Sequence, residues 1–288
     1  MDRNKARVQF GEMSPEQHKR LFGSAKTTAI TDEEITTQIL AIASGKGGVG
    51  KSTVTVNLAV ALHSAGHRVG ILDCDVYGFS IPRMLGIEKA TPVMRDEKII
   101  PIEAHGMKVI SMGNFVQGNT PVIWRGPMLG KVLEQFLTDV AWGELDFLLL
   151  DLPPGTGDVA LDVVRLLPKS SLILVTTPQA VAAGVASRAG QMAHKTNQRL
   201  LGVVENMSGF VCPHCGEQSA IFGEGGGRAL AQELGVELLG QIPLTLEARV
   251  LGDEGAPAAL VAGSLMQKSY TALAERVQRM LGVAVAQK

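Results

Sequence analysis

Short apolar runs alternate with longer stretches of helical pattern along most of this chain. The apolar runs are almost continuous, as expected for strands that are covered on both faces of a sheet. Helical stretches such as 54–65 and 178–194 lie between most of them. This alternation predicts an α/β fold, a doubly wound and mostly parallel sheet with helices on both faces. The strands are expected at residues 39–43, 69–72, 108–112, 147–150, 172–175, 201–204 and 238–240.

The same pattern divides the chain into two parts. Residues 1–37 are polar and lack sustained periodicity, so we expect an N-terminal arm that is partly disordered or holds a short helix. Within the arm, Ser14, Pro15 and Gln17 fit an N-cap, a first helical residue and a capping-box partner. Residues 38–288 contain no internal repeat or linker, which predicts one domain.

A glycine-rich segment follows the first expected strand and fits the phosphate-loop pattern G-x-x-x-x-G-K-[ST]. A strand before it and a helix after it are the context that this pattern requires, so we expect an ATP site. Backbone N–H groups and the helix N-terminus would bind the phosphates. Lys51 would neutralise the β- and γ-phosphates, Ser52 would ligate Mg²⁺, and Thr53 would contact the α-phosphate. The segment consists of Gly45, Lys46, Gly47, Gly48, Val49, Gly50, Lys51, Ser52 and Thr53.

A second lysine near the start of this loop is not required by the basic pattern. Lys46 resembles the extra lysine in the deviant Walker A motif of the MinD, ParA and nitrogenase-iron-protein class. That resemblance implies a catalytic lysine that reaches the phosphates of a partner subunit, as an arginine finger does. A solvated lysine is the alternative interpretation.

Two carboxylates end the second expected strand, where a doubly wound fold places its ligand crevice. Asp73 and Asp75 share a direction because alternate strand residues point to the same face, whereas Cys74 points away. Asp75 is the candidate for orienting the attacking water, and Asp73 for supporting Mg²⁺ or its waters. Cys74 is interpreted as a small residue of the core.

Another apolar strand ends in Asp151, which is the Walker B pattern. We expect Asp151 to hold Mg²⁺ through a water. The loop that follows begins with two prolines and continues with glycines, so it suits a switch whose Gly155 N–H senses the γ-phosphate. Asp158 is expected to cap the next helix.

The chain has three cysteines, and two of them, Cys212 and Cys215, form a C-x-x-C pair. In a reducing compartment such a pair indicates metal binding or redox chemistry rather than a structural bridge. Tetrahedral zinc and a [4Fe–4S] cluster each need four ligands, and one pair supplies two. Two copies of the chain on a two-fold axis would supply four thiolates. Zinc at this shared site, or a loop with two free thiols, remain as alternatives.

Together these motifs resemble the Mrp/ApbC family of iron–sulfur carrier ATPases over about residues 39–281. The resemblance implies a homodimer that binds ATP and hydrolyses it slowly. It also implies a [4Fe–4S] cluster bridging the two subunits and delivered to apo iron–sulfur proteins, with Cys212 and Cys215 as its ligands. It further implies an adenine contact from Asn206 and a turn containing Pro243 beside the base. The matching segments are 45–53, 73–78, 124–128, 151–158, 204–208 and 212–215, and no role follows for Arg125.

Composition limits the remaining function classes. The formal net charge of -1 gives no electrostatic reason to expect nucleic acid or an anionic membrane as a partner. No apolar run is long enough for a membrane helix and no secretory signal is present, so we expect a cytoplasmic protein.

Three other functions compete with the carrier interpretation. In a MinD/ParA-like positioning ATPase that binds membranes, the chain ends in a basic amphipathic helix, whereas residues 266–288 look like a helix docked on the sheet. A nitrogenase-iron-protein-like reductase needs cysteines near the second switch, and none lies between Cys74 and Cys212. A zinc-bridged nucleotide-binding dimer is the third alternative.

Overall fold

The computed structural model describes residues 37–75, 78–114, 126–155 and 158–284. The N-terminal arm with its expected helix start at Ser14, the pair 76–77 and the segment containing Trp124 and Arg125 lie outside the described residues.

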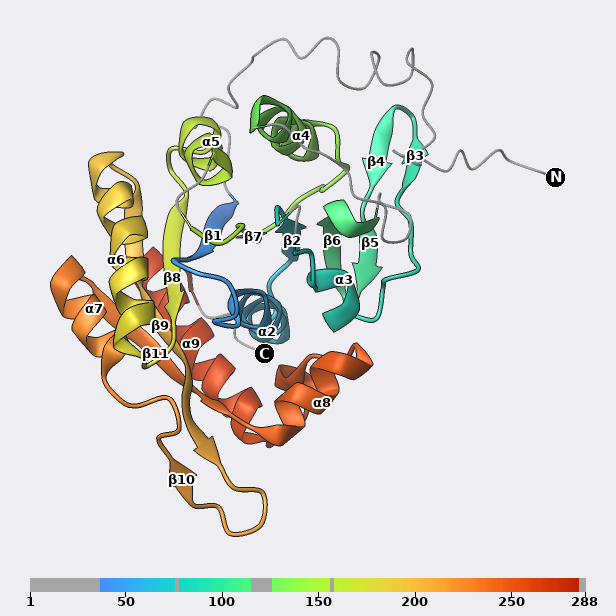
Figure 1. Ribbon diagram of the computed structural model, residues 1–288. Helices are drawn as coiled ribbons and strands as arrows, with labels where there is room; N and C mark the ends of the chain where they lie inside the picture. Colours follow the sequence, from blue (N-terminus) through green and yellow to red (C-terminus); the bar gives the residue numbers. More distant parts are fainter. Residues whose placement is uncertain (1–36, 76–77, 115–125, 156–157, 285–288) are drawn as a thin grey trace.

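A mostly parallel sheet runs through the middle of the molecule (Figure 1). Among the described residues it has nine strands. Eight follow the order β10-β9-β8-β1-β7-β2-β6-β5, and β11 pairs in parallel with residues 202–210 of β9. Only β5 and β10 pair antiparallel to their neighbours in this sheet. Its strands are β1 (Gln38–Ser44), β2 (Val69–Asp73), β5 (Ile102–Ala104), β6 (Met107–Ser111), β7 (Phe147–Asp151), β8 (Ser171–Thr176), β9 (Arg199–Val211), β10 (Gln218–Ser219) and β11 (Glu237–Leu244). A separate hairpin consists of β3 (Val93–Arg95) and β4 (Lys98–Ile100).

Helices cover both faces of this sheet, and each face has its own apolar core. Alternate strand residues such as Ala41 and Leu150 face α4, α5, α6 and α7, whereas Leu40 and Leu149 face α2 and α9. In Figure 1, α4 and α5 lie above the sheet and α2, α8 and α9 lie below it. The helices are α2 (Lys51–Ser64), α3 (Ile81–Met84), α4 (Gly126–Thr138), α5 (Asp158–Leu166), α6 (Ala180–Lys195), α7 (Gly226–Leu234), α8 (Leu246–Glu254) and α9 (Leu265–Leu281), with 3₁₀ turns η1 (Met112–Asn114) and η2 (Ala258–Leu260).

The predicted fold class is confirmed, because all seven apolar runs contribute to strands and the central strands are parallel. One local prediction is wrong. Pro243 was expected in a turn, but it lies inside β11, next to Ile242, which pairs with Asn206. The register shifts between Ile242 and Leu244, so the missing N–H of Pro243 falls at an irregularity where no regular ladder bond is needed.

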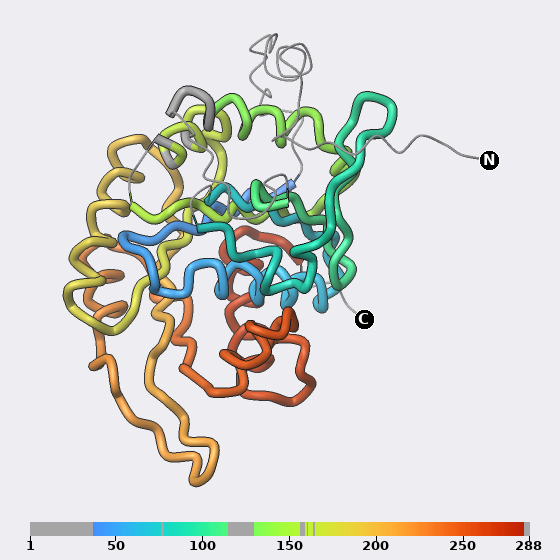
Figure 2. Tube along the Cα trace, turned by 45° about the vertical axis from the view of Figure 1, so that its right-hand side comes forward, coloured from blue at the N-terminus to red at the C-terminus, as the bar shows by residue number. Residues whose placement is uncertain are grey.

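Two features at the ends of the fold bear on function. The end of β9 and β10 form a hairpin that projects away from the body, at the lower end of Figures 1 and 2. The last helix, α9, packs on the sheet through Tyr270, Leu273 and Val277, which are almost fully buried. The expectation of a docked final helix is therefore confirmed. Among the described helices, none combines the length and the hydropathy that spanning a bilayer demands.

Candidate functional site

The phosphate loop joins the end of β1 to the start of α2, as the sequence predicts. Gly50 is the residue before α2 and has φ 79° and ψ 29°, a left-handed conformation that glycine adopts without strain. A Cβ atom at Gly50 would lie 2.2 Å from Nδ2 of Asn206, so there is no room for a side chain. The loop thus lies against the middle of β9, at a left-handed position that favours glycine.

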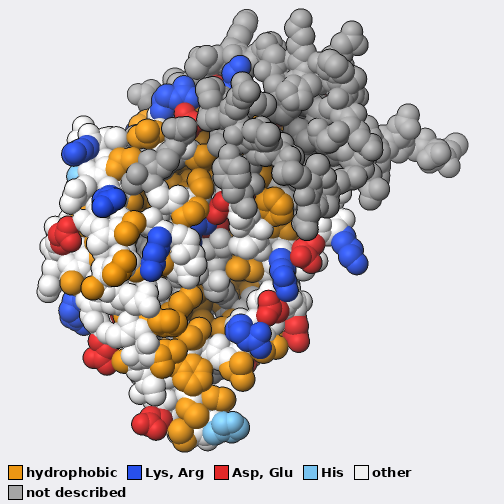
Figure 3. All heavy atoms as spheres, in the orientation of Figure 1, with side chains coloured by type: hydrophobic (Ala, Val, Ile, Leu, Met, Phe, Trp, Pro, Cys, Tyr) orange, Lys and Arg blue, Asp and Glu red, His pale blue; other side chains and the backbone are white. Residues whose placement is uncertain are grey.

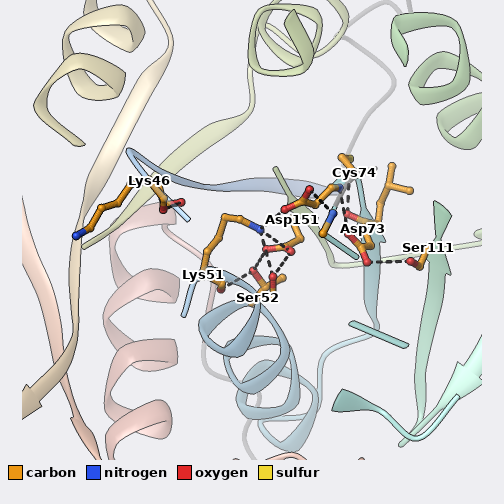
Figure 4. A network of polar contacts seen from close by, with 12 residues as sticks. Lys46, Lys51, Ser52, Asp73, Cys74, Ser111 and Asp151 are labelled. Atoms are coloured by element: carbon orange, nitrogen blue, oxygen red, sulfur yellow. Dashed lines mark hydrogen bonds and ion pairs between the residues drawn. The ribbon is translucent and has the colours of Figure 1, made fainter. Parts of the chain in front are cut away.

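Lys51, the first residue of α2, is buried and points into a cluster of acidic side chains (Figure 4). Its Nζ lies 2.7 Å from Oδ2 of Asp151 and 3.9 Å from Oδ2 of Asp75. These carboxylates compensate the buried charge in the absence of a nucleotide. The lysine predicted to bind phosphate is therefore already desolvated and aimed into the site.

Asp151 is fully buried at the end of β7 and is held by two hydroxyl groups of α2. Oγ of Ser52 donates to its Oδ2 at 2.6 Å, and Oγ1 of Thr55 donates to its Oδ1 at 2.7 Å. A hydroxyl and a carboxylate in contact are a donor set that suits Mg²⁺. Thr55 was not predicted from the sequence, although its position four residues after Lys51 places both on one face of the helix.

Asp73 ends β2 directly beside Asp151 and is also fully buried. It accepts hydrogen bonds from Oγ of Ser111 at 2.8 Å and from the Asp75 N–H at 3.1 Å. Burial, and then the charge of Asp151, raise the pKa of Asp73 to about 8. Burial and the neighbouring carboxylate thus favour the protonated form of Asp73. Its role toward Mg²⁺ stays a prediction.

The neighbours of Asp73 have different surroundings. The side chain of Cys74 belongs to the apolar core beneath α4, as predicted, and burial raises the pKa of its thiol. Asp75 is nearly buried, and its Oδ1 accepts the Gly78 N–H at 3.0 Å. Asp75 thus lies at the edge of the acidic cluster, where its role toward water stays a prediction.

Lys46 and Gly155 make contacts outside the acidic cluster. Figure 4 shows Lys46 directed away from Lys51 and Asp151, and its Nζ is 3.5 Å from Oε1 of Gln179 at the start of α6. The Gly155 N–H donates to the Ser44 carbonyl oxygen at 2.8 Å. The N–H group predicted to sense the γ-phosphate thus has a backbone partner within the chain.

The two residues expected near the base are Asn206, in the middle of β9, and Pro243, near the end of β11. Nδ2 of Asn206 donates to the Val49 carbonyl oxygen at 2.9 Å, and Pro243 is half-buried. Thr53 borders a separate cavity of about 270 Å³ between α2, α3 and α8. Arg83 and Arg249 line this cavity, and both pair with Asp253.

The C-x-x-C pair occupies the tip of the projecting hairpin. The Cys212 N–H donates to the Glu217 carbonyl oxygen, and the Gly216 N–H donates to the Cys212 carbonyl oxygen, both at 2.9 Å, which closes a tight turn. Cys212 is half-buried and Cys215 is exposed. Hydrogen bonds from the Cys215 and His214 N–H groups lower the pKa of the Cys212 thiol, which favours the thiolate form that binds metals.

The cysteine pair is an incomplete metal site. Across the described part of the chain, no cluster of three or more histidine, cysteine or acidic side chains has the arrangement to hold a metal ion. Cys212 and Cys215 therefore offer two ligands, half of what a tetrahedral metal or a [4Fe–4S] cluster takes.

A nucleotide-type phosphate loop and half of a metal site thus occur on one chain, and comparison with known families agrees with this combination. The family model described as ParA, NUBPL iron-transfer P-loop NTPase, matches residues 35–278. The chain belongs to this family. The resemblance predicted from the sequence motifs is confirmed, and so is the P-loop fold class.

Three similar proteins share one description, iron-sulfur cluster carrier protein. The iron-sulfur cluster carrier protein of Mycobacterium tuberculosis (strain ATCC 25618 / H37Rv) is 52% identical over 266 residues, which cover 88% of this chain and 69% of the relative. The protein so described from Mycobacterium leprae is 48% identical over 295 residues, covering 96% of this chain and 76% of the relative. That from Bacillus subtilis is 57% identical over 205 residues, covering 71% and 58%.

Solved structures agree on the fold. The nucleotide-binding protein in complex with ADP from Archaeoglobus fulgidus is 42% identical, with a TM-score of 0.67, covering 76% of this chain and 86% of that chain. The cell division ATPase MinD of Pyrococcus furiosus is 25% identical, with a TM-score of 0.61, covering 84% and 99%.

Proposed function

We propose that this iron-transfer P-loop NTPase binds ATP and Mg²⁺, carries a [4Fe–4S] cluster between two copies of the chain, and delivers it to apo iron–sulfur proteins. The observation that carries the proposal is the two-thiol half-site at the tip of the β9–β10 hairpin, on the same chain as a complete phosphate loop. Relatives at about half identity are described as iron-sulfur cluster carrier proteins, which agrees with it.

The cluster is the cargo, and its binding calls for a second copy of this chain. A cluster with four thiolate ligands takes Cys212 and Cys215 from each of two hairpins. The hairpin projects from the body (Figure 1), so we expect its tip to be accessible to the tip of a second copy. Hydrophobic side chains gather over the hairpin at the lower end of Figure 3. Ile221, two residues after β10, is 57% exposed. An apolar surface around the thiols favours contact between the two copies.

ATP would occupy the loop that ends at Lys51. The phosphates replace the carboxylates as partners of the Lys51 ammonium group, and Ser52 and Asp151 hold Mg²⁺, which supplies positive charge to the phosphate oxygens. Thr53 is next to the α-phosphate, and the adjoining cavity leaves open space beside it. Asn206 and Pro243 remain the residues predicted to contact the base.

Slow hydrolysis would use two further residues. Asp75 orients the attacking water from the edge of the acidic cluster. Lys46 points out of its own site, so in a dimer it can approach the phosphates bound by the other copy. Charge supplied in this way is worth about 10³–10⁵ in rate. We favour the carrier over a MinD/ParA-like positioning ATPase, because relatives at about half identity are described as iron-sulfur cluster carrier proteins, whereas MinD of Pyrococcus furiosus is 25% identical.

Anaerobic reconstitution with iron and sulfide tests the proposal. We expect four iron and four sulfide ions per two chains, a dimeric mass, and loss of loading in Cys212→Ala and Cys215→Ala. Cys74→Ala is the matched control, because Cys74 lies in the core and should not affect loading. Zinc bound in place of iron under these conditions, or a loaded species that is a single chain, would overturn the proposal.

A further inference from the structure

One strand connects the phosphate loop to the cysteine pair. Near its middle, β9 touches the loop through the hydrogen bond from Nδ2 of Asn206 to the Val49 carbonyl oxygen. The strand ends at Val211, and Cys212 follows directly. Any shift of Asn206 therefore acts on the chain only six residues before the first thiol.

Between these two points the strand is interrupted by a bulge, defined here as residues 207–209. Asn206 pairs with Ile242 and Phe210 pairs with Leu244, so β9 uses four steps where β11 uses two. Met207 has φ 56° and Gly209 has φ 80°, both in the left-handed region. A non-glycine residue in that region persists only when its surroundings hold it there, and such residues occur often at functional sites.

Glu205 holds this bulge in place. Its carboxylate is fully buried and accepts three hydrogen bonds, from Oγ of Ser208 at 2.7 Å, Nε2 of Gln241 at 2.7 Å and the Gly227 N–H at 2.6 Å. Ser208 belongs to the bulge, Gln241 to β11, and Gly227 to the first turn of α7. One carboxylate thus ties the bulge to two elements of the body.

We propose that Glu205 is a positioning residue that makes the bulge a rigid joint and so transmits nucleotide binding at the phosphate loop to Cys212 and Cys215. The inference rests on the proposed function, in which Asn206 contacts the base. We infer that this contact draws its side-chain amide away from the Val49 carbonyl oxygen. A rigid joint passes the resulting movement of β9 to the hairpin, whereas a loose joint absorbs it within residues 207–209. Coupling of this kind needs an element with defined arrangements that both sites contact.

Thiol alkylation of the full, cluster-free, reduced chain measures the coupling. The rate at which a maleimide modifies Cys212 and Cys215 is followed by mass spectrometry with and without MgADP, and buried Cys74 serves as the internal reference. For the wild type we expect MgADP to change the rate at the pair by about fivefold or more, the usual lower range of coupling between sites.

Three variants then separate positioning from general stability. Ser208→Ala removes the bond from the bulge to Glu205, and Glu205→Gln keeps the side-chain shape but replaces an acceptor with a donor. Both should bind MgADP as the wild type does and lose the effect of MgADP on alkylation. Ser208→Thr keeps the hydroxyl group, so MgADP should change the alkylation rate of this variant as it does in the wild type.

Each other outcome overturns the inference. These outcomes are an unchanged alkylation rate in the wild type, a wild-type response in Ser208→Ala and Glu205→Gln, or a loss of MgADP affinity that parallels the loss of response. Ser208→Ala alone decides the matter if Glu205→Gln fails to fold, since Ser208 is only half-buried. Iron and sulfide counting tests the carrier function separately. A chain that loads its cluster normally, but whose alkylation rate does not change with MgADP, refutes the coupling and leaves the carrier function standing.

Discussion

Lys51 and Asp151 form a buried ion pair across the mouth of the phosphate loop, with Nζ 2.7 Å from Oδ2. Both side chains are almost completely withdrawn from water. A nucleotide must exchange this contact for a phosphate contact, so the pair sets the state from which binding starts.

Asp151→Asn should therefore destabilise the nucleotide-free protein. Removing one member of a buried pair leaves an uncompensated charge, which costs about 3–5 kcal/mol in free energy of unfolding. Asp75 at 3.9 Å offsets part of this, so we expect the lower end of that range. Urea unfolding without nucleotide measures it. Thr55→Val, which removes one hydrogen bond to the same carboxylate, is the control and should cost about 1 kcal/mol. Equal stability of Asp151→Asn and the wild type would contradict the pairing.

Stability should also depend on pH through Asp73. Its pKa is about 8 in the folded protein and 3.8 as the ordinary value, because of burial and the nearby charge of Asp151. Between these values the folded state keeps a proton that the unfolded state has lost. The contribution of Asp73 to the free energy of unfolding is therefore largest below about pH 4. It falls as the pH rises to about 8, by at most about 1.4 kcal/mol per pH unit.

Asp73→Asn isolates this contribution. The amide does not titrate, so the free energy of unfolding of the variant should change less between pH 5 and pH 8 than that of the wild type. Urea titrations at a series of pH values in the absence of nucleotide and Mg²⁺ measure the difference. Parallel pH profiles for the two proteins would show that Asp73 is ionised in the folded state.

The pattern of the sequence determines the central fold for a physical reason. Strands buried on both faces must be continuously apolar, so runs such as 147–150 are visible without any knowledge of their neighbours. Contacts made over long sequence separations are not visible in this way. Thr55 and Ser111 were missed because a hydroxyl in a helix or strand has no local mark of the carboxylate it will meet.

The same limit explains the error at Pro243. The turn was implied by the family resemblance, yet here the pairing partner β9 carries a bulge and the strand continues past the proline. The phosphate loop and the C-x-x-C pair were predicted because each consists of residues that are close together in the sequence. Glu205 was named only as part of a motif, since its three donors come from separate elements.

Lys46→Ala should separate hydrolysis from nucleotide binding. Its ammonium group points away from Lys51, so the affinity of a single chain for nucleotide should stay unchanged. Steady-state phosphate release should fall about 10³-fold or more, the range for loss of a charge supplied in trans. Gln179→Ala, which removes the contact at 3.5 Å from Lys46, is the matched control and should have little effect. Equal losses of rate and affinity in Lys46→Ala would place the lysine in its own nucleotide site.

Cluster loading should control the association of two chains. Each hairpin supplies two thiols, so the loaded state needs a second copy and the chain without cluster does not. Light scattering under anaerobic conditions should give twice the chain mass after reconstitution and the single mass after the iron is removed by a chelator. Cys215→Ser should stay at the single mass throughout, because a serine hydroxyl is a poor ligand for iron–sulfur clusters. Lys51→Ala extends the test to the nucleotide, since cluster transfer by this variant should no longer respond to ATP, while the wild type should respond. A wild-type chain that holds its full iron content at the single mass would mean that the four ligands come from one chain, and the arrangement of the two hairpins would then be wrong.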